Sequence, residues 1–543
     1  MKKKLLITLL AIIATIACTL ALAACGGNED NSPTIHSHTW STTYTEDGDR
    51  HYQTCSSCND KHYTEHSYIE GVCICGKLLS VNGTIGLMYA AYNGGESYSV
   101  IGCSLTEKNI IIPSEYNGKP VTSISNFAFE NCSLESITIP SSVTYIAETA
   151  FWRCPSMTNI IVKDGNTKYH SSGNCLVETE SKTLIVGCST SLIPTDESVT
   201  KIGNAAFCGC TSLTDITIPD NITEIGIGAF NGCTSLENAT LPQKITDLCT
   251  GLFSNCSALK TIFIPDSVIV IGDSAFYGCT ALNDIILPDS ITTICGYAFY
   301  GCSSLSQITI PSNITSISGD VFFNCTSLES ITINYGVTSI DSTAFRGCTS
   351  LKELSIPDSV TYIGEDAFSS CTSLTSITIP NSVTYIGEDA FSSCTSLTSI
   401  TIPNSVTYIS STTLSGCTSL TTIIVAENNP NYKSVNNCLL NKAGTKLIVG
   451  CKNSIIPDSV TSIGDFAFYD CSSLTKVTIG NSVNNIGYYA FRGCSSLTSI
   501  TFEDTVAEWN AIIKGDNWDL NTGDYTIYCT DGEIAKDGTI TMY

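Results

Sequence analysis

The sequence is short of positive charge. It has 25 lysines and arginines against 50 aspartates and glutamates, which gives a net charge of −25. Nucleic acids and anionic membrane surfaces bind proteins through a basic surface patch. The composition therefore argues against both as partners, and we expect the negative charge to keep the protein soluble.

The sequence also lacks the motifs of common catalytic sites. It has no glycine-rich phosphate loop, no Gly-x-Ser-x-Gly motif and no His-Glu-x-x-His motif. Catalysis requires a nucleophile or a base held beside a partner group, and His170 is the one histidine after residue 66. The recurring Asp266 and Asp289 stand in Pro-Asp-Ser turns, where an aspartate side chain caps the turn. We expect no enzymatic activity.

The sequence does contain a repeat of 23 residues, which recurs between about residues 132 and 502. One aromatic position marks the period in nine steps of 23, at Phe207, Phe230, Phe253, Phe276, Phe299, Phe322, Phe345, Phe368, Phe391 and Leu414. Further copies carry Phe129, Phe151, Phe468 and Phe491, which gives 14 coils. Self-similarity at such a period indicates a solenoid.

Each coil is expected to hold two short strands and a turn. In residues 374–380, Ile377 and Ile379 alternate with polar residues, which is typical of a half-buried strand. Pro380 ends this strand because proline cannot donate to a sheet ladder. A second strand is predicted over residues 383–386 and a tight helical turn over residues 388–391. Such a coil is stable only when neighbouring coils stack on it.

Two longer intervals interrupt the period. From Phe151 to Phe207 is 56 residues and from Leu414 to Phe468 is 54, and both intervals contain an Asn-Cys-Leu segment followed by a Val-Gly-Cys segment. We interpret them as the same longer coil used twice. Each is expected to add one hairpin-like winding, and neither is expected to be a domain boundary.

The phrase Leu-x-x-Ile-x-Ile-Pro-x-x-Val-Thr-x-Ile-Gly-x-x-Ala-Phe-x-x-Cys resembles the BspA-type leucine-rich repeat, also called the Treponema pallidum type. The resemblance extends from about Tyr116 to Phe502, and residues 508–529 are similar to the tail that often closes such proteins. It implies a β-rich solenoid over residues 78–502, including an N-terminal cap, and a capping segment over residues 503–543. It also implies a bacterial surface protein, because the members of this family are bacterial surface proteins. Some of them are implicated in binding host matrix proteins or other cells.

The first 24 residues have the layout of an export signal. Three lysines precede an apolar run over residues 5–24, and Leu22-Ala23-Ala24-Cys25 resembles the lipobox of bacterial lipoproteins. The resemblance implies cleavage before Cys25 and a lipid on its sulfur; the alternatives are an ordinary signal peptide or an uncleaved anchor. Residues 25–34 are polar and contain glycine, as in a flexible tether. We expect an exported protein anchored by lipid to the outer face of the cell membrane, with no other membrane contact.

A cysteine and histidine cluster lies over residues 35–77. Cys55 and Cys58 are separated by 14 residues from Cys73 and Cys75, which is close to the spacing of four-cysteine zinc sites. The second pair departs from the usual gap of two residues, so His51 or His66 could replace a thiolate. A module too small for a core needs a cross-link. Zinc is the favoured interpretation, and disulfides or no cross-link are the alternatives.

Fourteen of the 29 cysteines occupy one repeat position. A disulfide framework is possible in an exported protein. However, equivalent side chains in a stack point the same way at about 4.8 Å, and a buried thiol behaves as a small apolar residue. We therefore favour a ladder of thiols. Cys175 with Cys188, and Cys438 with Cys451, are the better disulfide candidates.

The binding surface of a repeat solenoid is the face on which side chains vary while the core stays fixed. One outward column of the first strand is variable and polar, and its neighbour is mostly threonine but becomes Phe263 and Ile286. We expect a protein or glycan ligand on this face, with the central residues Asp215, Thr261, Phe263, Asp284, Ile286, Gln307 and Glu353. The alternative is that threonine merely suits a strand and that nothing binds there.

Three functions fit these observations. A surface protein that mediates adhesion or protein interaction explains the signal, the tether and the array. A lipoprotein that captures metal or solute through the cysteine and histidine cluster leaves 14 coils without a role. An inert spacer that projects the cluster also fits, but the lipid would hold the cluster nearest the membrane, where a spacer cannot project it. We favour the first.

Overall fold

The computed structural model describes residues 41, 45–47, 50–54, 61–65, 68–69, 72–73, 84, 86–103 and 108–543. The expected signal, the tether and most of the cysteine and histidine cluster lie outside these residues. Before the array, β1 (Thr45–Asp47), β2 (Arg50–Thr54) and β3 (Lys61–Glu65) form an antiparallel sheet. β4 (Tyr68–Ile69) pairs with β5 (Val72–Cys73).

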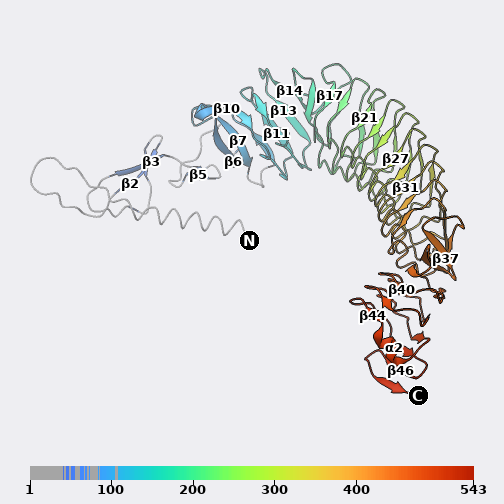
Figure 1. Cartoon of the computed structure of the whole chain (residues 1–543). Helices are drawn as coiled ribbons and strands as arrows, with labels where there is room; N and C mark the ends of the chain where they lie inside the picture. The colour runs from blue at the N-terminus through green and yellow to red at the C-terminus, as the bar shows by residue number, and fades with distance from the viewer. Residues whose placement is uncertain are drawn as a thin grey trace, which may run out of the picture.

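The array begins with a cap that merges into the first coil. β6 (Leu87–Tyr92) pairs antiparallel with β7 (Ser97–Cys103), around the 3-10 turn η1 (Asn93–Gly95). β7 pairs parallel with β10 (Lys119–Ile124), and β10 pairs parallel with the second strand of the first coil. β8 (Asn109–Ile111) pairs parallel with the first strand of that coil. β9 (Glu115–Tyr116) pairs antiparallel with β10. From this cap the coils follow a curved arc to the C-terminal strands (Figure 1).

Each coil contributes two short strands that lie parallel to those of its neighbours. Pairs such as Thr261 with Asp284 and Tyr362 with Tyr385 are one period apart and in register. The first strands are β11 (Ser136–Ile139), β13 (Asn159–Val162), β18 (Asp215–Thr217), β20 (Asn238–Thr240), β22 (Thr261–Phe263), β24 (Asp284–Ile286), β26 (Gln307–Ile310), β28 (Ser330–Ile333), β30 (Glu353–Ser355), β32 (Ser376–Thr378), β34 (Ser399–Ile402), β36 (Thr422–Val425), β41 (Lys476–Ile479) and β43 (Ser499–Phe502). The second strands are β12 (Tyr145–Ile146), β17 (Lys201–Ile202), β19 (Glu224–Ile225), β21 (Asp247–Leu248), β23 (Val270–Ile271), β25 (Thr293–Ile294), β27 (Ser316–Ile317), β29 (Ser339–Ile340), β31 (Tyr362–Ile363), β33 (Tyr385–Ile386), β35 (Tyr408–Ile409), β40 (Ser462–Ile463) and β42 (Asn485–Ile486). The expected solenoid of short strands is therefore confirmed.

The segment after the second strand is a chain of turns. The sequence predicted a helical turn over residues 388–391, but Asp389 has φ 51°, and Asp366 in the preceding coil has φ 54°. A left-handed residue at this point prevents a continuing helix. The amide of Phe368 donates instead to the carbonyl of Ala390 in the next coil at 2.8 Å. Hydrogen bonds between coils thus replace the hydrogen bonds of a helix.

The core is a stack of phenylalanine rings beside a column of thiols. Consecutive rings from Phe207 to Phe391 have centroids 5.0 to 5.8 Å apart and are nearly parallel. From the second of these coils onward, the cysteine donates its S–H to the phenylalanine carbonyl of the preceding coil, as Cys302 does to Phe276 at 3.2 Å. The same bond runs at 3.1 to 3.3 Å from Cys233 through Cys417. The expected thiol ladder is confirmed.

The two pairs named as the better disulfide candidates are not bonded to each other, and their four thiols are free. Cys175 Sγ donates to the carbonyl of Gly173, and Cys188 Sγ donates to that of Asn174. Cys438 and Cys451 make the equivalent bonds in the second long coil. Nearby backbone carbonyls satisfy these sulfurs, so burial requires no bridge.

The two long coils share one plan, as the sequence indicated. In the first, β14 (Tyr169–Ser172), β15 (Cys175–Glu178) and β16 (Thr183–Val186) form an antiparallel winding, and β16 then pairs parallel with β17. β37 (Tyr432–Val435), β38 (Cys438–Asn441) and β39 (Lys446–Val449) repeat it in the second. The long coils coincide with the boundaries between the three clusters of buried residues.

The C-terminal residues extend both strand series. Thr505 caps α2 (Val506–Ala511) by accepting a hydrogen bond from the amide of Glu508. β44 (Ile513–Lys514) pairs with β42, and β45 (Thr526–Tyr528) pairs with β43 and leads into β46 (Gly532–Ala535) and β47 (Ile540–Met542). Within the residues that the structure describes, no helix has the length and apolar character to cross a membrane.

Candidate binding face

The first strands expose one face along the array. On β22 and β24, Ile262 and Ile285 are buried, whereas the residues on either side of them are exposed. This alternation is expected of strands with one face against the core. All seven residues expected to bind are exposed: Asp215, Thr261, Phe263, Asp284, Ile286, Gln307 and Glu353. They lie on five strands, β18, β22, β24, β26 and β30.

Phe263 and Ile286 form the apolar centre of this face. They are in register on neighbouring strands, and their exposed fractions are 68% and 77%. Thr240 and Thr309 are also exposed and occupy the same repeat position in the coils on either side. Two large apolar side chains left in water side by side are available for a partner to cover.

The surroundings of this pair are polar and carry charge. The side-chain amide of Asn238 donates to Asp215 at 2.8 Å, which lowers the pKa of that carboxyl. The next outward column carries the ion pair of Lys260 with Glu237 at 2.7 Å. An exposed ion pair of this kind adds little stability. The ion pair leaves the carboxylates of Asp215 and Asp284 as the charged groups of the column next to Phe263 and Ile286.

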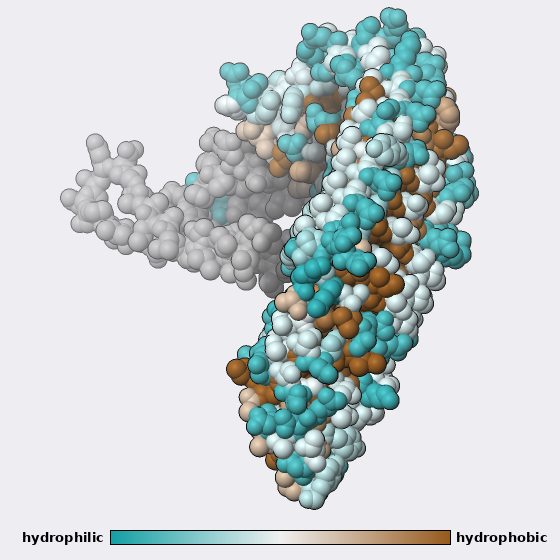
Figure 2. All heavy atoms as spheres, turned by 45° about the vertical axis from the view of Figure 1, so that its right-hand side comes forward, coloured by the Kyte–Doolittle hydropathy of each residue, from teal (hydrophilic) through white to brown (hydrophobic). Residues whose placement is uncertain are grey.

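The space-filling view shows that apolar residues gather in a stripe along the array, between neutral and hydrophilic residues (Figure 2). Phe263 and Ile286 are joined among the exposed large apolar side chains by Ile424, at 46%. Ile424 occupies the same repeat position seven coils after Phe263. Ile111 and Ile161 are exposed at this position as well, and among the described strands Phe263 and Ile286 are the two such residues that lie on neighbouring strands.

The expected zinc ligands cannot be assembled here. Cys55, Cys58, Cys75 and His66 lie outside the described residues, and so does Cys25, the expected lipidation site. His51 falls in β2 and Cys73 in β5, where only the backbone is described. Within the described ranges, no group of three histidine, cysteine, aspartate or glutamate side chains is placed to hold a metal ion.

Sequence reasoning missed the aromatic columns on the surface. Tyr362, Tyr385 and Tyr408 stack with centroids 5.0 and 4.8 Å apart along the second strands. Tyr277 and Tyr300 stack in the same way at 4.8 Å, beside the buried phenylalanines. The repeat period places such residues one above another, so aligning the copies could have found both columns.

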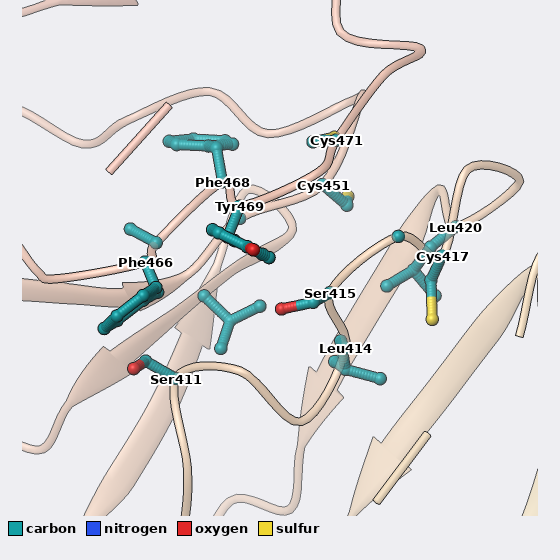
Figure 3. Close-up of a pocket in the computed structure, with 14 residues that line it drawn as sticks. Ser411, Leu414, Ser415, Cys417, Leu420, Cys451, Phe466, Phe468, Tyr469 and Cys471 are labelled. Atoms are coloured by element: carbon teal, nitrogen blue, oxygen red, sulfur yellow. The ribbon is translucent and has the colours of Figure 1, made fainter. Parts of the chain in front are cut away.

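The second long coil contains a small cavity where the phenylalanine stack is broken. Leu414 replaces the ring, and the cavity between it and Phe468 has a volume of about 10 Å³. Figure 3 shows the Ser415 hydroxyl pointing into this space. That hydroxyl is buried and has no hydrogen-bond partner in the described part of the chain. The cavity is large enough for one water molecule and too small for a ligand.

Comparisons with known proteins find several leucine-rich repeat proteins. Among solved structures, a leucine-rich repeat protein from Bacteroides ovatus is 26% identical, covers 81% of this chain and 98% of its own, and has a TM-score of 0.44. A leucine-rich cell surface protein from Faecalibacterium prausnitzii is 22% identical, with 87% and 98% covered and a TM-score of 0.35. The Treponema pallidum leucine-rich repeat protein is 21% identical, with 53% and 87% covered and a TM-score of 0.21. A search of the curated proteins finds no match.

A scan against protein-family models matches the BspA type leucine-rich repeat region, in six copies, to residues 96–177, 181–282, 250–373, 315–443 and 447–511. Repeat proteins of this type generally are surface or interaction proteins and typically act as binding scaffolds. The matched ranges span well over half of the sequence. The chain therefore belongs to the BspA-type leucine-rich repeat family.

Proposed function

We propose that this protein is a lipid-anchored surface protein that binds an extracellular protein or glycan through the exposed face of its first strands. The observation that carries the proposal is the exposed pair of Phe263 and Ile286, in register on neighbouring strands. Apolar side chains at the centre of a polar rim are typical of an interface hot spot. The lipobox at Cys25 supports the anchor.

The double substitution Phe263→Thr with Ile286→Thr tests this face. It restores the residue that most coils have at this position, so the strands keep a side chain suited to a sheet. Burying the two side chains against a partner contributes about 1.5 to 3 kcal/mol each. We expect the variant to bind roughly 100-fold more weakly.

The measurement is surface plasmon resonance of the purified full-length protein over immobilised extracellular-matrix proteins and microbial surface proteins. Ile424→Thr is the matched control, because it makes the same chemical change in the same column, far along the array. Equal binding by the double variant and the native protein would refute the strand face as the site. Metabolic labelling with a fatty acid tests the anchor, and Cys25→Ala should abolish the label.

A further inference from the structure

The first long coil opens a cleft in the series of second strands. β12 pairs with β10, and the series resumes only at β16, which pairs with β17. In place of a neighbouring strand, the Tyr169 hydroxyl accepts a hydrogen bond from the amide of Ile146 at 3.0 Å. The cleft between these elements has a volume of about 530 Å³. Small-molecule sites commonly have volumes of about 300 to 1,000 Å³.

Planar polar groups line this cleft, and other residues hold them in place. Asn204 accepts a hydrogen bond from the amide of Ile227 at 2.9 Å and donates to Glu148 at 3.2 Å. The Thr149 hydroxyl donates to the side-chain amide oxygen of Asn126 at 2.9 Å. An amide or a carboxylate offers two polar atoms in one plane, which suits two neighbouring hydroxyl groups of a ligand. Such orientation before binding reduces the entropy lost on binding.

A tyrosine ring forms one wall. Tyr145 is 49% exposed, and the residue in register with it on β10 is Ser123, which is too small to cover the ring. In the second long coil the equivalent Tyr408 is stacked on Tyr385 at 4.8 Å. Tyr145 itself lines the cleft, and an exposed aromatic face suits the C–H face of a sugar ring.

The charge of the cleft excludes an anionic ligand. Its lining includes Glu148 and Glu178 but no lysine, arginine or histidine. A carboxylate or sulfate on the ligand would meet like charge at short range. We infer that this cleft binds a short neutral oligosaccharide, through the amide and carboxylate groups and the Tyr145 ring.

The second long coil supplies an internal comparison. Its strands repeat the same plan, but Ser411 and Asn441 occupy the positions of Glu148 and Glu178. We therefore expect the sugar to bind at the first long coil and not at the second.

The test is a glycan array of neutral and sialylated oligosaccharides, probed with the purified full-length protein and followed by calorimetry with the best binder. We expect binding of neutral glycans only, weakened at least tenfold by Tyr145→Ala and by Glu148→Ala. Tyr408→Ala is the matched control and should leave the affinity unchanged. Thermal melts of each variant report whether it is folded.

Several results would overturn the proposal: no neutral glycan bound, preference for sialylated glycans, spermidine bound in place of sugar, or native affinity in the folded Tyr145→Ala variant. The cleft is separate from the strand face. Phe263→Thr with Ile286→Thr should therefore retain sugar binding, so a failure of the proposed function and a failure of this inference are distinguishable.

Discussion

The sulfur atoms of Cys103 and Cys132 lie 2.9 Å apart where the N-terminal cap meets the first coil. Both side chains are buried, with exposed fractions of 8% and 2%. Cys132 begins the cysteine column, and from Cys154 onwards many of its members donate instead to a backbone carbonyl, as Cys154 does to Phe129 at 3.1 Å. At the cap, the partner of the Cys132 sulfur is therefore a second sulfur, where later cysteines of the column have a backbone carbonyl.

This contact predicts a disulfide under oxidising conditions. With oxidised glutathione as the oxidant, the two thiols lose two protons and two electrons, and the bond closes a loop of about 30 residues. Such a loop stabilises the fold by about 3.5 kcal/mol. Peptide mapping after alkylation should find a linked pair and a higher melting temperature, and Cys103→Ser should lose both effects. Alkylation of both cysteines after oxidation would contradict the prediction.

The buried thiols predict a loss of stability at alkaline pH. Burial raises the pKa of Cys279 and of Cys325 from the ordinary value of 9.0 to about 12, and it raises the pKa of Cys302 as well. Above about pH 9 the unfolded chain loses these protons while the folded chain keeps them. The contribution of these thiols to the free energy of unfolding is therefore complete below pH 8 and is lost as pH rises toward 12. Each thiol lowers the free energy of unfolding by up to about 1.4 kcal/mol for each pH unit in this range.

Thermal melts between pH 7 and pH 11 measure this effect. Serine keeps a hydrogen-bond donor but does not titrate in this range, so Cys279→Ser with Cys302→Ser and Cys325→Ser should reduce the slope of stability against pH. The comparison is between the slopes of stability against pH of the native protein and of the triple variant, because the substitutions also lower stability at pH 7. Identical slopes would show that the thiols do not cause the alkaline loss.

Much of the fold was predictable because each coil repeats the same pattern of buried and exposed positions. The positions of Phe299 and Cys302 recur every 23 residues, so the solenoid and its column of buried thiols followed from the sequence. The exposed column through Asp284 followed from the alternation of a half-buried strand. The long coils were also recognisable, since their two copies share the segments around Cys175 and Cys438.

What escaped prediction depends on contacts that the period does not encode. Cys103 lies in the cap, outside the repeat, so its distance from Cys132 could not be inferred. The cleft beside Tyr145 exists because one strand pairing is missing, which is a matter of topology. The helical turn at Asp389 was wrong because a hydrogen bond to the next coil competes with one inside the segment.

The long coils predict a strict need for glycine at two positions. A Cβ added to Gly187 would lie 2.0 Å from Cε1 of Phe207, and one added to Gly450 would lie 2.1 Å from the same atom of Phe468. Both rings are fully buried and cannot move freely. Gly187→Ala should therefore lower the free energy of unfolding by at least 1 to 3 kcal/mol, roughly the usual cost of overpacking.

Urea unfolding measures this cost, with Gly480→Ala as the control. The nearest atom to a Cβ at Gly480 is 3.7 Å away, and its backbone is not left-handed, so the control should be close to neutral. Equal stability of the two variants would mean that the Phe207 ring has room to shift, contrary to the packing described.

The cysteine and histidine cluster before the array predicts about one zinc ion per chain. Cys55 and Cys58 have the two-residue gap of a zinc-binding pair, and loss of both thiolates leaves too few ligands for a tetrahedral site. Cys55→Ser with Cys58→Ser should therefore reduce the zinc content of the purified protein from one equivalent to none, as measured by elemental analysis. Cys302→Ser, which removes a thiol of the ladder, is the control and should retain the metal. Zinc-free native protein would overturn the prediction, because a segment this small gains its stability from a cross-link and not from a core.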